Sequence, residues 1–307
     1  MMQNPIFNRE IKISSRSVRI PLIITLFNGI LCLVTLVNMY SAVAQVESTA
    51  AIQYTSFMDM YEFVTTMEFI LLMFIMPAMT AASISGERER QTLEMMLTTK
   101  MTAAQVVMGK LMSALSTLLL LIVSSFPAIT MVFVYGGVTF WDMVSMILCY
   151  IATAFFTGSL GICFSALFKR STVSTVTTYG VLIAAVAGTY FINRFSYSLS
   201  SMHINHSMAA YGFGEQAAKI SSGNAIYLLL LNPAATFYTI LNGQLQGNAP
   251  VAKLASQFGM EPSGFIMEYW VPLSLFVQIA LGIVLAALAV YAVEPVKRKM
   301  KKQMVKK

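Results

Sequence analysis

Six long, mainly apolar runs constrain the fold of this chain more strongly than any other feature of its sequence. A helix that crosses a bilayer needs about 20 mainly apolar residues, and six segments reach that length. They span residues 20–44, 61–85, 106–135, 141–168, 173–192 and 270–293. Only 11% of the residues are charged, against about 25% in a soluble globular protein. The sequence therefore predicts an all-α, polytopic membrane protein with six transmembrane helices, and it excludes a soluble or disordered chain.

A seventh apolar segment, 225–241, is shorter than the other six. Asn232 and Pro233 interrupt it near its middle, and proline lacks the N–H that a continuous helix needs. Broken helices are tolerated at membrane depth where protein covers them. We therefore expect a re-entrant or interfacial pair of helices on the outer face, within the outer loop 193–269, with Asn232, Pro233 and Phe237 as its marker residues.

The basic residues predict how the chain is oriented. Lys and Arg gather in the cytoplasmic segments of membrane proteins, and 17 of the 20 here fall inside if both termini are cytoplasmic. Seven lie in the basic tail 294–307, whereas the short outer segments 45–60 and 136–140 contain none. A crossing at 225–241 would carry that tail outside. We expect a single transmembrane domain, 1–307, in the cell membrane, and the net charge of +7 then reflects topology and not nucleic-acid binding.

The segment 5–20 has the pattern of an amphipathic helix. At about 100° per residue its basic residues share one face, and they are Arg9, Lys12, Arg16 and Arg19. Phe7, Ile11 and Val18 lie on the opposite face. Such a helix lies in the membrane interface with its basic side toward anionic lipid headgroups. The alternative is a positive-inside charge cluster with accidental amphipathicity.

The loop 86–101, between the second and third runs, contains a dense cluster of charges. Its charged residues are Glu87, Arg88, Glu89, Arg90 and Glu94, and its apolar residues at helical spacing are Leu93, Met96 and Leu97. Gly86 is expected to end the preceding helix, and Thr102 with Gln105 forms a capping box that starts the next one. A short amphipathic helix of this kind suits docking on a soluble partner, although periodicity alone fits a solvated loop equally well.

This loop resembles a known family. The run from Ile84 to Lys110 is similar to the loop after the second span in ABC transporter permeases of the type-2 exporter class. The matching residues are Glu87, Glu89, Thr92, Leu93, Glu94, Leu97, Thr98, Thr99, Gly109 and Lys110. The opening residues Asn4, Pro5, Arg9, Glu10, Lys12 and Arg16 resemble the start of the family, and Pro233 and Phe237 resemble its segment before the last span. Lys100 is a departure, since relatives often have proline there.

The resemblance implies roles for these segments. In the family the N-terminal helix is the elbow helix, and the loop helix is the coupling helix, which contacts a separate ABC ATP-binding subunit and transmits its closure to the spans. The implied coupling surface comprises Glu87, Arg88, Glu89, Arg90, Thr92, Leu93, Glu94, Met96 and Leu97. Six spans are half of the usual set, so the resemblance also implies a second permease copy or a paralogue.

The sequence lacks the motifs of an enzyme. No G-x-x-x-x-G-K-[ST] phosphate loop occurs, and Gly109-Lys110 lacks the earlier glycine that would let backbone N–H groups surround a phosphate. ATP and Mg are therefore expected in the partner subunit, and no cofactor is expected in this chain. His203 and His206 lack the third ligand that a zinc site requires, so no metal site is expected.

Glu68 is the one carboxylate that lies clearly inside an expected span. An intramembrane acid is by default a candidate for function. In one interpretation Glu68 contacts a cationic substrate, and in the other it pairs with a polar group of the helix bundle.

The leading hypothesis for function is the membrane subunit of an ATP-driven exporter that works by alternating access. Its substrate would be hydrophobic or amphipathic, such as a drug, a peptide or a lipid, because the spans are mainly apolar. Two alternatives are an ion-coupled secondary transporter, which would need more intramembrane ionisable groups than Glu68, and a non-transporting membrane scaffold or sensor.

Overall fold

The computed structural model describes residues 5–49, 54–98, 101–134, 138–211, 220–247, 250–261 and 264–294. Within these ranges the chain is mainly helical and contains no strand. Six of the described segments are long and apolar enough to cross a membrane. They are Pro21–Ser41, Met58–Glu89, Ala103–Pro127, Phe140–Leu167, Ser171–Ile204 and Trp270–Val293. The prediction of an all-α, polytopic membrane protein with six transmembrane helices is therefore confirmed.

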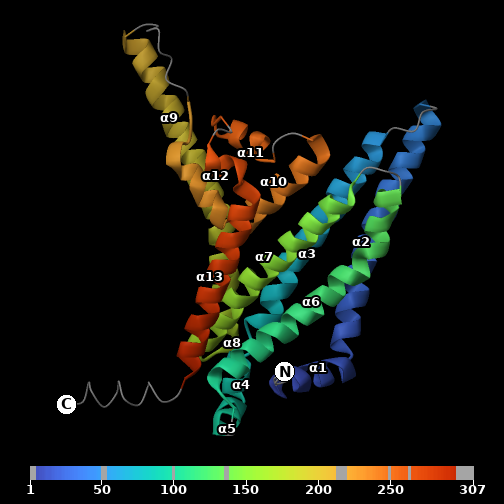
Figure 1. The fold of residues 1–307 in the computed structure, drawn as a ribbon, viewed down its shortest axis with the longest axis vertical. Helices are drawn as coiled ribbons and strands as arrows, with labels where there is room; N and C mark the ends of the chain where they lie inside the picture. Colours follow the sequence, from blue (N-terminus) through green and yellow to red (C-terminus); the bar gives the residue numbers. More distant parts are fainter. Residues whose placement is uncertain are drawn as a thin grey trace. The chain divides into compact units, whose positions relative to one another are not determined.

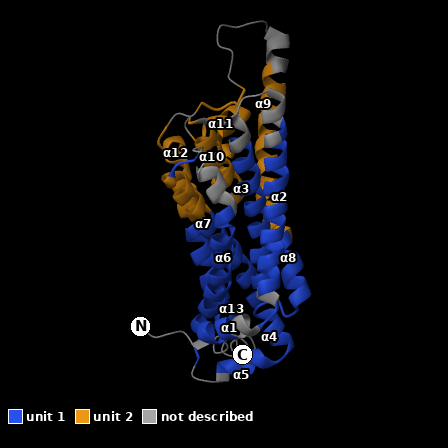
Figure 2. Ribbon diagram, turned by 90° about the vertical axis from the view of Figure 1, so that its right-hand side faces the viewer, with its two compact units in different colours: residues 1–139, 150–179, 279–307 blue, residues 140–149, 180–278 orange. Residues whose placement is uncertain are grey.

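The chain divides into two compact units (Figure 2). Unit 1 comprises residues 1–139, 150–179 and 279–307, and unit 2 comprises residues 140–149 and 180–278. Three helices contribute residues to both units, namely α7 (Phe140–Leu167), α8 (Ser171–Ile183) and α13 (Trp270–Val293). The chain thus passes between the units inside continuous helices.

Unit 1 contains the N-terminal helices. They are α1 (Pro5–Arg16), α2 (Arg19–Thr49), α3 (Tyr54–Thr80), α4 (Ser85–Glu89), α5 (Thr92–Thr98) and α6 (Ala103–Val134). α3 packs against α2 and α6, and α1 packs against α6. In both views α1, α4 and α5 lie at the same end of this unit (Figure 1, Figure 2). This end therefore gathers the elbow segment and the loop that resemble the permease family.

Small residues on α7 allow it to approach α3 closely. A Cβ atom at Gly161 would lie 2.1 Å from Oγ1 of Thr80, and one at Gly158 would lie 2.3 Å from Cε of Met76. Close approach through small residues is a common way for membrane helices to pack, because water does not drive them together in lipid. Gly161, which faces the short side chain of Thr80, is therefore needed for this close approach, whereas the flexible end of Met76 could move away from a larger residue at position 158.

Two local predictions about helix ends have opposite outcomes. Thr102 and Gln105 form the predicted capping box, because the N–H of Gln105 donates to Oγ1 of Thr102 at 3.2 Å and the N–H of Thr102 donates to Oε1 of Gln105 at 3.0 Å. The prediction for Gly86 is wrong, because this residue lies inside α4. α3 instead ends at Thr80, and a turn over residues 81–84 joins it to α4.

Unit 2 contains the remaining helical elements. They are the π-helical turn η1 (Ala184–Gly188), α9 (Thr189–Tyr211), the 3-10 helix η2 (Gly223–Leu231), α10 (Pro233–Gln246), α11 (Ala252–Gln257) and α12 (Phe265–Glu268). α9 extends well beyond residue 192, where the fifth run was expected to end, so the first part of the loop 193–269 is helical. Trp270, Phe258 and Ile226 belong to one buried apolar cluster, which forms the core of this unit.

η2 and α10 form a bent pair, with an angle of 96° between them, at the break that the sequence predicts. Asn232 begins α10, because its Oδ1 accepts the N–H of Ala234 at 2.9 Å and that of Ala235 at 3.3 Å. Pro233 follows at a position whose N–H has no partner inside a helix. Gly247 ends α10 with a φ of 61°, a left-handed conformation that glycine adopts without strain. The placement of this pair on the outer face stays a prediction.

Some predictions fall outside the described residues. The basic tail 294–307 is described only at Glu294, and residues 99–100 of the loop 86–101 are not described.

Candidate functional site

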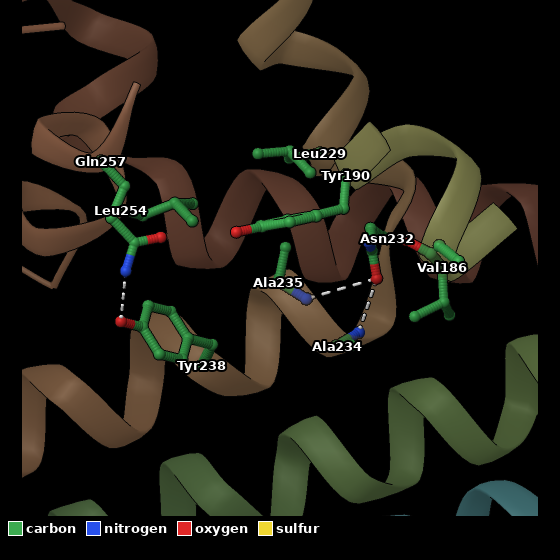
Figure 3. A pocket seen from close by; sticks show the side chains of 10 residues that line it. Val186, Tyr190, Leu229, Asn232, Ala234, Ala235, Tyr238, Leu254 and Gln257 are labelled. Atoms are coloured by element: carbon green, nitrogen blue, oxygen red, sulfur yellow. Dashed lines mark hydrogen bonds between the residues drawn. The ribbon is translucent and has the colours of Figure 1, made fainter. Parts of the chain in front are cut away.

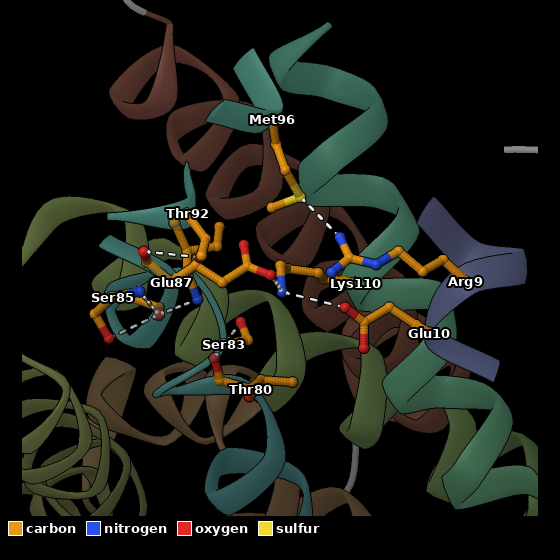
Figure 4. A network of polar contacts seen from close by, with 11 residues as sticks. Arg9, Glu10, Thr80, Ser83, Ser85, Glu87, Thr92, Met96 and Lys110 are labelled. Carbon is orange, nitrogen blue, oxygen red and sulfur yellow. Dashed lines mark hydrogen bonds and ion pairs between the residues drawn. The ribbon is translucent and has the colours of Figure 1, made fainter. Parts of the chain in front are cut away.

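Two short helices, α4 and α5, stand where one amphipathic helix was expected. Arg90 and Gln91 separate them, and Gln91 has a φ of 58°, a left-handed conformation that is uncommon outside glycine. Oγ1 of Thr92 donates to the carbonyl oxygen of Glu87 at 3.1 Å, which closes the turn (Figure 4). The charged cluster therefore begins in α4, and the apolar residues follow in α5.

Side chains from α7 and α8 hold the start of α4. Oγ of Ser165 accepts the N–H of Ile84 at 2.8 Å and the N–H of Ser85 at 2.9 Å. Such N–H groups at the start of a helix have no partner within the helix itself. Oγ of Ser174 donates to the carbonyl oxygen of Ala81 at 2.6 Å. The turn between α3 and α4 is thus fixed by two other helices of unit 1.

Arg88 and Glu89 bind the turn between α7 and α8. Nη1 of Arg88 donates to the carbonyl oxygen of Phe168 at 3.0 Å, and Nη2 donates to that of Ala166 at 2.9 Å. The guanidinium therefore caps the C-terminal end of α7. The carboxylate of Glu89 accepts the N–H of Ser171 at 3.0 Å and its Oγ–H at 2.8 Å, at the N-terminus of α8 where a negative charge is favoured. Any displacement of α4 would therefore pull on α7 and α8 or break these hydrogen bonds.

Lys110 of α6 joins α4 to α1. Its Nζ lies 2.8 Å from Oε1 of Glu87 and 3.5 Å from Oε1 of Glu10, and its side chain is only 7% exposed. A second contact joins α1 to α5, since Nη1 of Arg9 donates to Sδ of Met96 at 3.3 Å (Figure 4). The family resemblance marked Lys110 and Glu10 without a role. The structure brings them together in one ion-pair cluster that no sequence spacing reveals.

The exposed side of α4 and α5 differs from the surface that helical spacing selected. Leu93 is 4% exposed and packs inside the chain, whereas Met95 is 70% exposed. Met96 and Leu97 are half-buried. We define the α4–α5 face by its exposed residues, which are Glu89, Arg90, Gln91, Thr92, Glu94 and Met95. Sequence reasoning missed Met95, because periodicity does not show which side of a short helix the rest of the chain covers.

α1 presents its described basic residues to the exterior. Arg9 and Lys12 are exposed, whereas Ile6 is 1% exposed where α1 packs against α6. The prediction of one helix over 5–20 is wrong in its end, because α1 ends at Arg16 and Arg19 begins α2. The side chains of Arg16 and Arg19 lie outside the described part of the structure. A position in the membrane interface stays a prediction for this helix.

Glu68 of α3 lies in the interior of unit 1. It is 0% exposed, and its Oε1 accepts the hydroxyl of Ser125 on α6 at 2.5 Å. Its Oε2 has no hydrogen-bond partner among the described residues. No Lys or Arg side chain in the described ranges forms an ion pair with it. The polar neighbours of the carboxyl group are therefore neutral hydroxyls, those of Ser125 and Tyr150.

The bent pair of unit 2 borders a cavity of about 400 Å³ (Figure 3). Tyr190, Asn232 and Tyr238 are among the residues that line it. Nδ2 of Asn232 donates to the carbonyl oxygen of Val186 and to Oγ1 of Thr189, each at 2.9 Å. Since the oxygen of Asn232 caps α10, its whole amide is used within the chain. Phe237, 6% exposed, is buried on α10.

One protein-family model matches nearly the whole chain. The family model described as ABC-2 family transporter protein matches residues 5–294, which include every helix from α1 to α13. The chain belongs to the ABC-2 transporter family. A search of curated proteins finds no match for this ABC-2 protein.

Membership of the ABC-2 family establishes the class of the protein. An ABC-2 protein is the membrane component of an ABC transporter, not itself a P-loop ATPase, and such permeases generally work with an ATP-binding subunit. The chain is therefore a multi-pass membrane permease. In the described part of this ABC-2 permease, no group of three or more His, Cys, Asp or Glu side chains is arranged to hold a metal ion.

Proposed function

We propose that this permease is the membrane-spanning subunit of an ATP-driven exporter whose ATP-binding partner docks on the α4–α5 face. The observation that carries the proposal is the position of this face. It exposes Met95 next to Glu94, with Arg90 also exposed, on a segment bonded to α1, α6, α7 and α8. Apolar anchors supply affinity in protein interfaces, and flanking charges fix orientation.

The same bonds give the movement of α4 a route to the spans. ATP and Mg would bind in the partner subunit, and closure of that subunit would displace α4. Arg88 and Glu89 would transmit the displacement to α7 and α8, and Lys110 would transmit it to α6 and α1. A conformational change of this kind needs contacts that differ between two states, and these hydrogen bonds and ion pairs are the candidates.

The proposed transporter is an assembly of two permease chains with the ATP-binding partner. Two copies of this chain, or this chain and a paralogue, would form the pathway and work by alternating access. The chain would lie in the cell membrane with both termini in the cytoplasm, where the α4–α5 face meets the ATPase. α1 would lie in the interface as the elbow helix, and the bent pair of η2 and α10 would cover the outer exit. The substrate would be a hydrophobic or amphipathic drug, peptide or lipid.

Co-purification of the ATP-binding partner tests the docking surface. Met95→Asp is expected to reduce the ATPase recovered with the tagged permease by about tenfold or more, because a buried apolar anchor in an interface is worth about 2 kcal/mol or more. Ala104→Asp is the matched control, since it adds the same charge to an exposed position in the first turn of α6, outside this face. Equal recovery in both variants would remove the α4–α5 face as the docking site. If the wild-type chain recovers no P-loop protein, the exporter proposal itself fails.

One observation favours a second candidate function. Glu68 is a buried carboxyl group within a span, the kind of group that an ion-coupled secondary transporter would use to carry a proton or cation, although such a transporter would need further groups of this kind and membership of the ABC-2 family favours ATP-driven transport. Transport into vesicles driven by an imposed proton gradient, without ATP or ATPase, would support this function. Loss of that transport in Glu68→Gln would assign the coupling to this residue.

A further inference from the structure

A cavity of about 350 Å³ lies in unit 1 between α2 and α6. Its walls are mainly apolar, with Leu31, Leu36 and Met39 from α2 and Pro127 from α6. Its polar lining residues are Asn28, Thr35, Ser124 and Ser125. The volume falls in the range of about 300–1,000 Å³ that is usual for small-molecule sites. An apolar cavity with a few convergent polar groups suits an amphipathic molecule.

The N–H and O–H donors that line this cavity are already used in hydrogen bonds within the chain. Nδ2 of Asn28 donates to the carbonyl oxygen of Ile24 and to Oγ of Ser124. The hydroxyl of Thr35 donates to the carbonyl oxygen of Leu31, and that of Ser124 donates to the carbonyl oxygen of Leu121. What these groups retain for a ligand is acceptor lone pairs. The cavity therefore suits a molecule that donates hydrogen bonds and offers little to an anion.

Ser125 connects the cavity wall to Glu68. Its hydroxyl donates to Oε1 of Glu68, so the carboxyl group lies directly behind a residue that lines the cavity. The second oxygen of Glu68 is buried and forms no close hydrogen bond among the described residues, and the other polar neighbour of the carboxyl group, Tyr150, is neutral. A buried carboxylate without a cation is costly, and a positively charged ligand would supply the missing charge. The acceptors in the wall and the acid behind it thus favour the same ligand chemistry.

We propose that the α2–α6 cavity, backed by Ser125 and Glu68, binds the cationic head of an amphipathic amine, with its apolar part against Leu31, Leu36 and Met39. This inference rests on the proposed export function and names the substrate class as lipophilic cations that carry N–H donors. Glu68 is the specificity-determining residue, because the remaining acceptors of the cavity are neutral.

Cys32 offers a direct probe of occupancy. It lines the cavity and is exposed, whereas Cys149 and Cys163 are buried. The full-length permease, in bilayers of neutral phosphatidylcholine, is labelled with the uncharged reagent N-ethylmaleimide, and the rate at Cys32 is followed by mass spectrometry. Dodecylammonium, dodecanol and dodecanoate are added at the same mole ratio to lipid. These three probes share one apolar tail and differ in the charge of the head group.

Dodecylammonium is expected to slow the labelling of Cys32 at least tenfold more than dodecanol does, and dodecanoate is expected to protect least. In Glu68→Gln the protection by dodecylammonium should fall to that by dodecanol, whereas Glu62→Gln, an exposed position on the same helix, should behave as wild type. Similar protection by all three probes in the wild-type chain, or an undiminished preference for the cation in Glu68→Gln, would overturn the proposal. Absence of protection by any probe would overturn it as well.

The labelling needs neither ATP nor a partner subunit. A negative result here therefore leaves the exporter proposal intact, and failure to recover an ATPase leaves the binding site intact. The wild-type probe series also tests the site if Glu68→Gln does not insert into the membrane.

Discussion

Replacing Lys110 by methionine should uncouple α1 and α4 from α6. The substitution keeps most of the apolar stem of the side chain but removes the ammonium group that lies 2.8 Å from Glu87 and 3.5 Å from Glu10. Both carboxylates then lose their cation, and Oε2 of Glu87 already has no hydrogen-bond partner among the described residues. The structure therefore predicts a loss of stability at the end of unit 1 that contains α1, α4 and α5.

The size of this loss follows from the exposure of the three side chains. Breaking a fully buried ion pair costs about 3–5 kcal/mol. The side chain of Lys110 is 7% exposed, but those of Glu87 and Glu10 are 19% and 31% exposed, so water recovers part of the cost. We expect a loss of about 2–3 kcal/mol. At roughly 2 °C per kcal/mol for a chain of this size, the melting temperature should fall by about 4–6 °C.

Thermal unfolding of the purified permease in detergent, read by the loss of its monodisperse size-exclusion peak, measures this shift. Glu87→Gln in the Lys110→Met background should restore about 1 kcal/mol, because a neutral amide is cheaper to leave unpaired than a carboxylate. Lys169→Met, at an exposed position, is the matched control and should change stability by less than about 0.5 kcal/mol. If the effects of Lys110→Met and Glu87→Gln simply add within about 0.5 kcal/mol, the ion-pair cluster does not couple these helices.

Three further predictions test other contacts. Arg88→Gln should lower transport but leave recovery of the ATP-binding partner unchanged, because Arg88 bonds to Phe168 and Ala166 inside the chain. If Arg88→Gln instead loses the partner, as Met95→Asp should, then Arg88 belongs to the docking face. Asn232→Ala should destabilise unit 2 by about 2–3 kcal/mol, since it removes a helix cap worth about 1 kcal/mol and the two hydrogen bonds from Nδ2 to the carbonyl of Val186 and to Oγ1 of Thr189. Limited proteolysis of residues 220–261 reads the loss, and Asn232→Asp, which keeps the cap, should lose less. Gly161→Ala should lower the stability of the fold by about 1–3 kcal/mol, because the added methyl group would lie 2.1 Å from Oγ1 of Thr80. Gly29→Ala in α2, where nothing lies within 4 Å, is the control and should not destabilise the fold. Equal melting temperatures for the two variants would contradict the close packing of α3 and α7.

The parts of the fold that the sequence predicts are those dictated by local chemistry. Hydropathy identifies the spans, because every backbone N–H and C=O in lipid must be satisfied within a helix. Asn232-Pro233 marks the bend between η2 and α10, since one residue caps a helix and the other cannot continue one. Thr102 and Gln105 mark the start of α6, because their side chains cap each other's backbone N–H groups.

The contacts of the candidate site depend on residues far apart in the chain. Arg88 bonds to Phe168, and Glu89 bonds to Ser171, across about 80 residues. The family resemblance assigns these two side chains to the coupling surface, although the chain itself uses them in internal hydrogen bonds. The burial of Leu93 and the exposure of Met95 have the same origin, because tertiary packing decides which side of α5 is covered.

The π-helical turn Ala184–Gly188 has a consequence for the length of the chain. A π turn closes its hydrogen bonds over five residues instead of four, so it holds one residue more than an α-helix of the same course. Deletion of a single residue here would restore a regular helix of the same course and leave the later side chains of α9 pointing in nearly the same directions. The change would fall on the turn itself, where the carbonyl oxygen of Val186 accepts a hydrogen bond from Nδ2 of Asn232. The number of residues between α8 and α9, and not only their identity, is thus tied to the bent pair of unit 2.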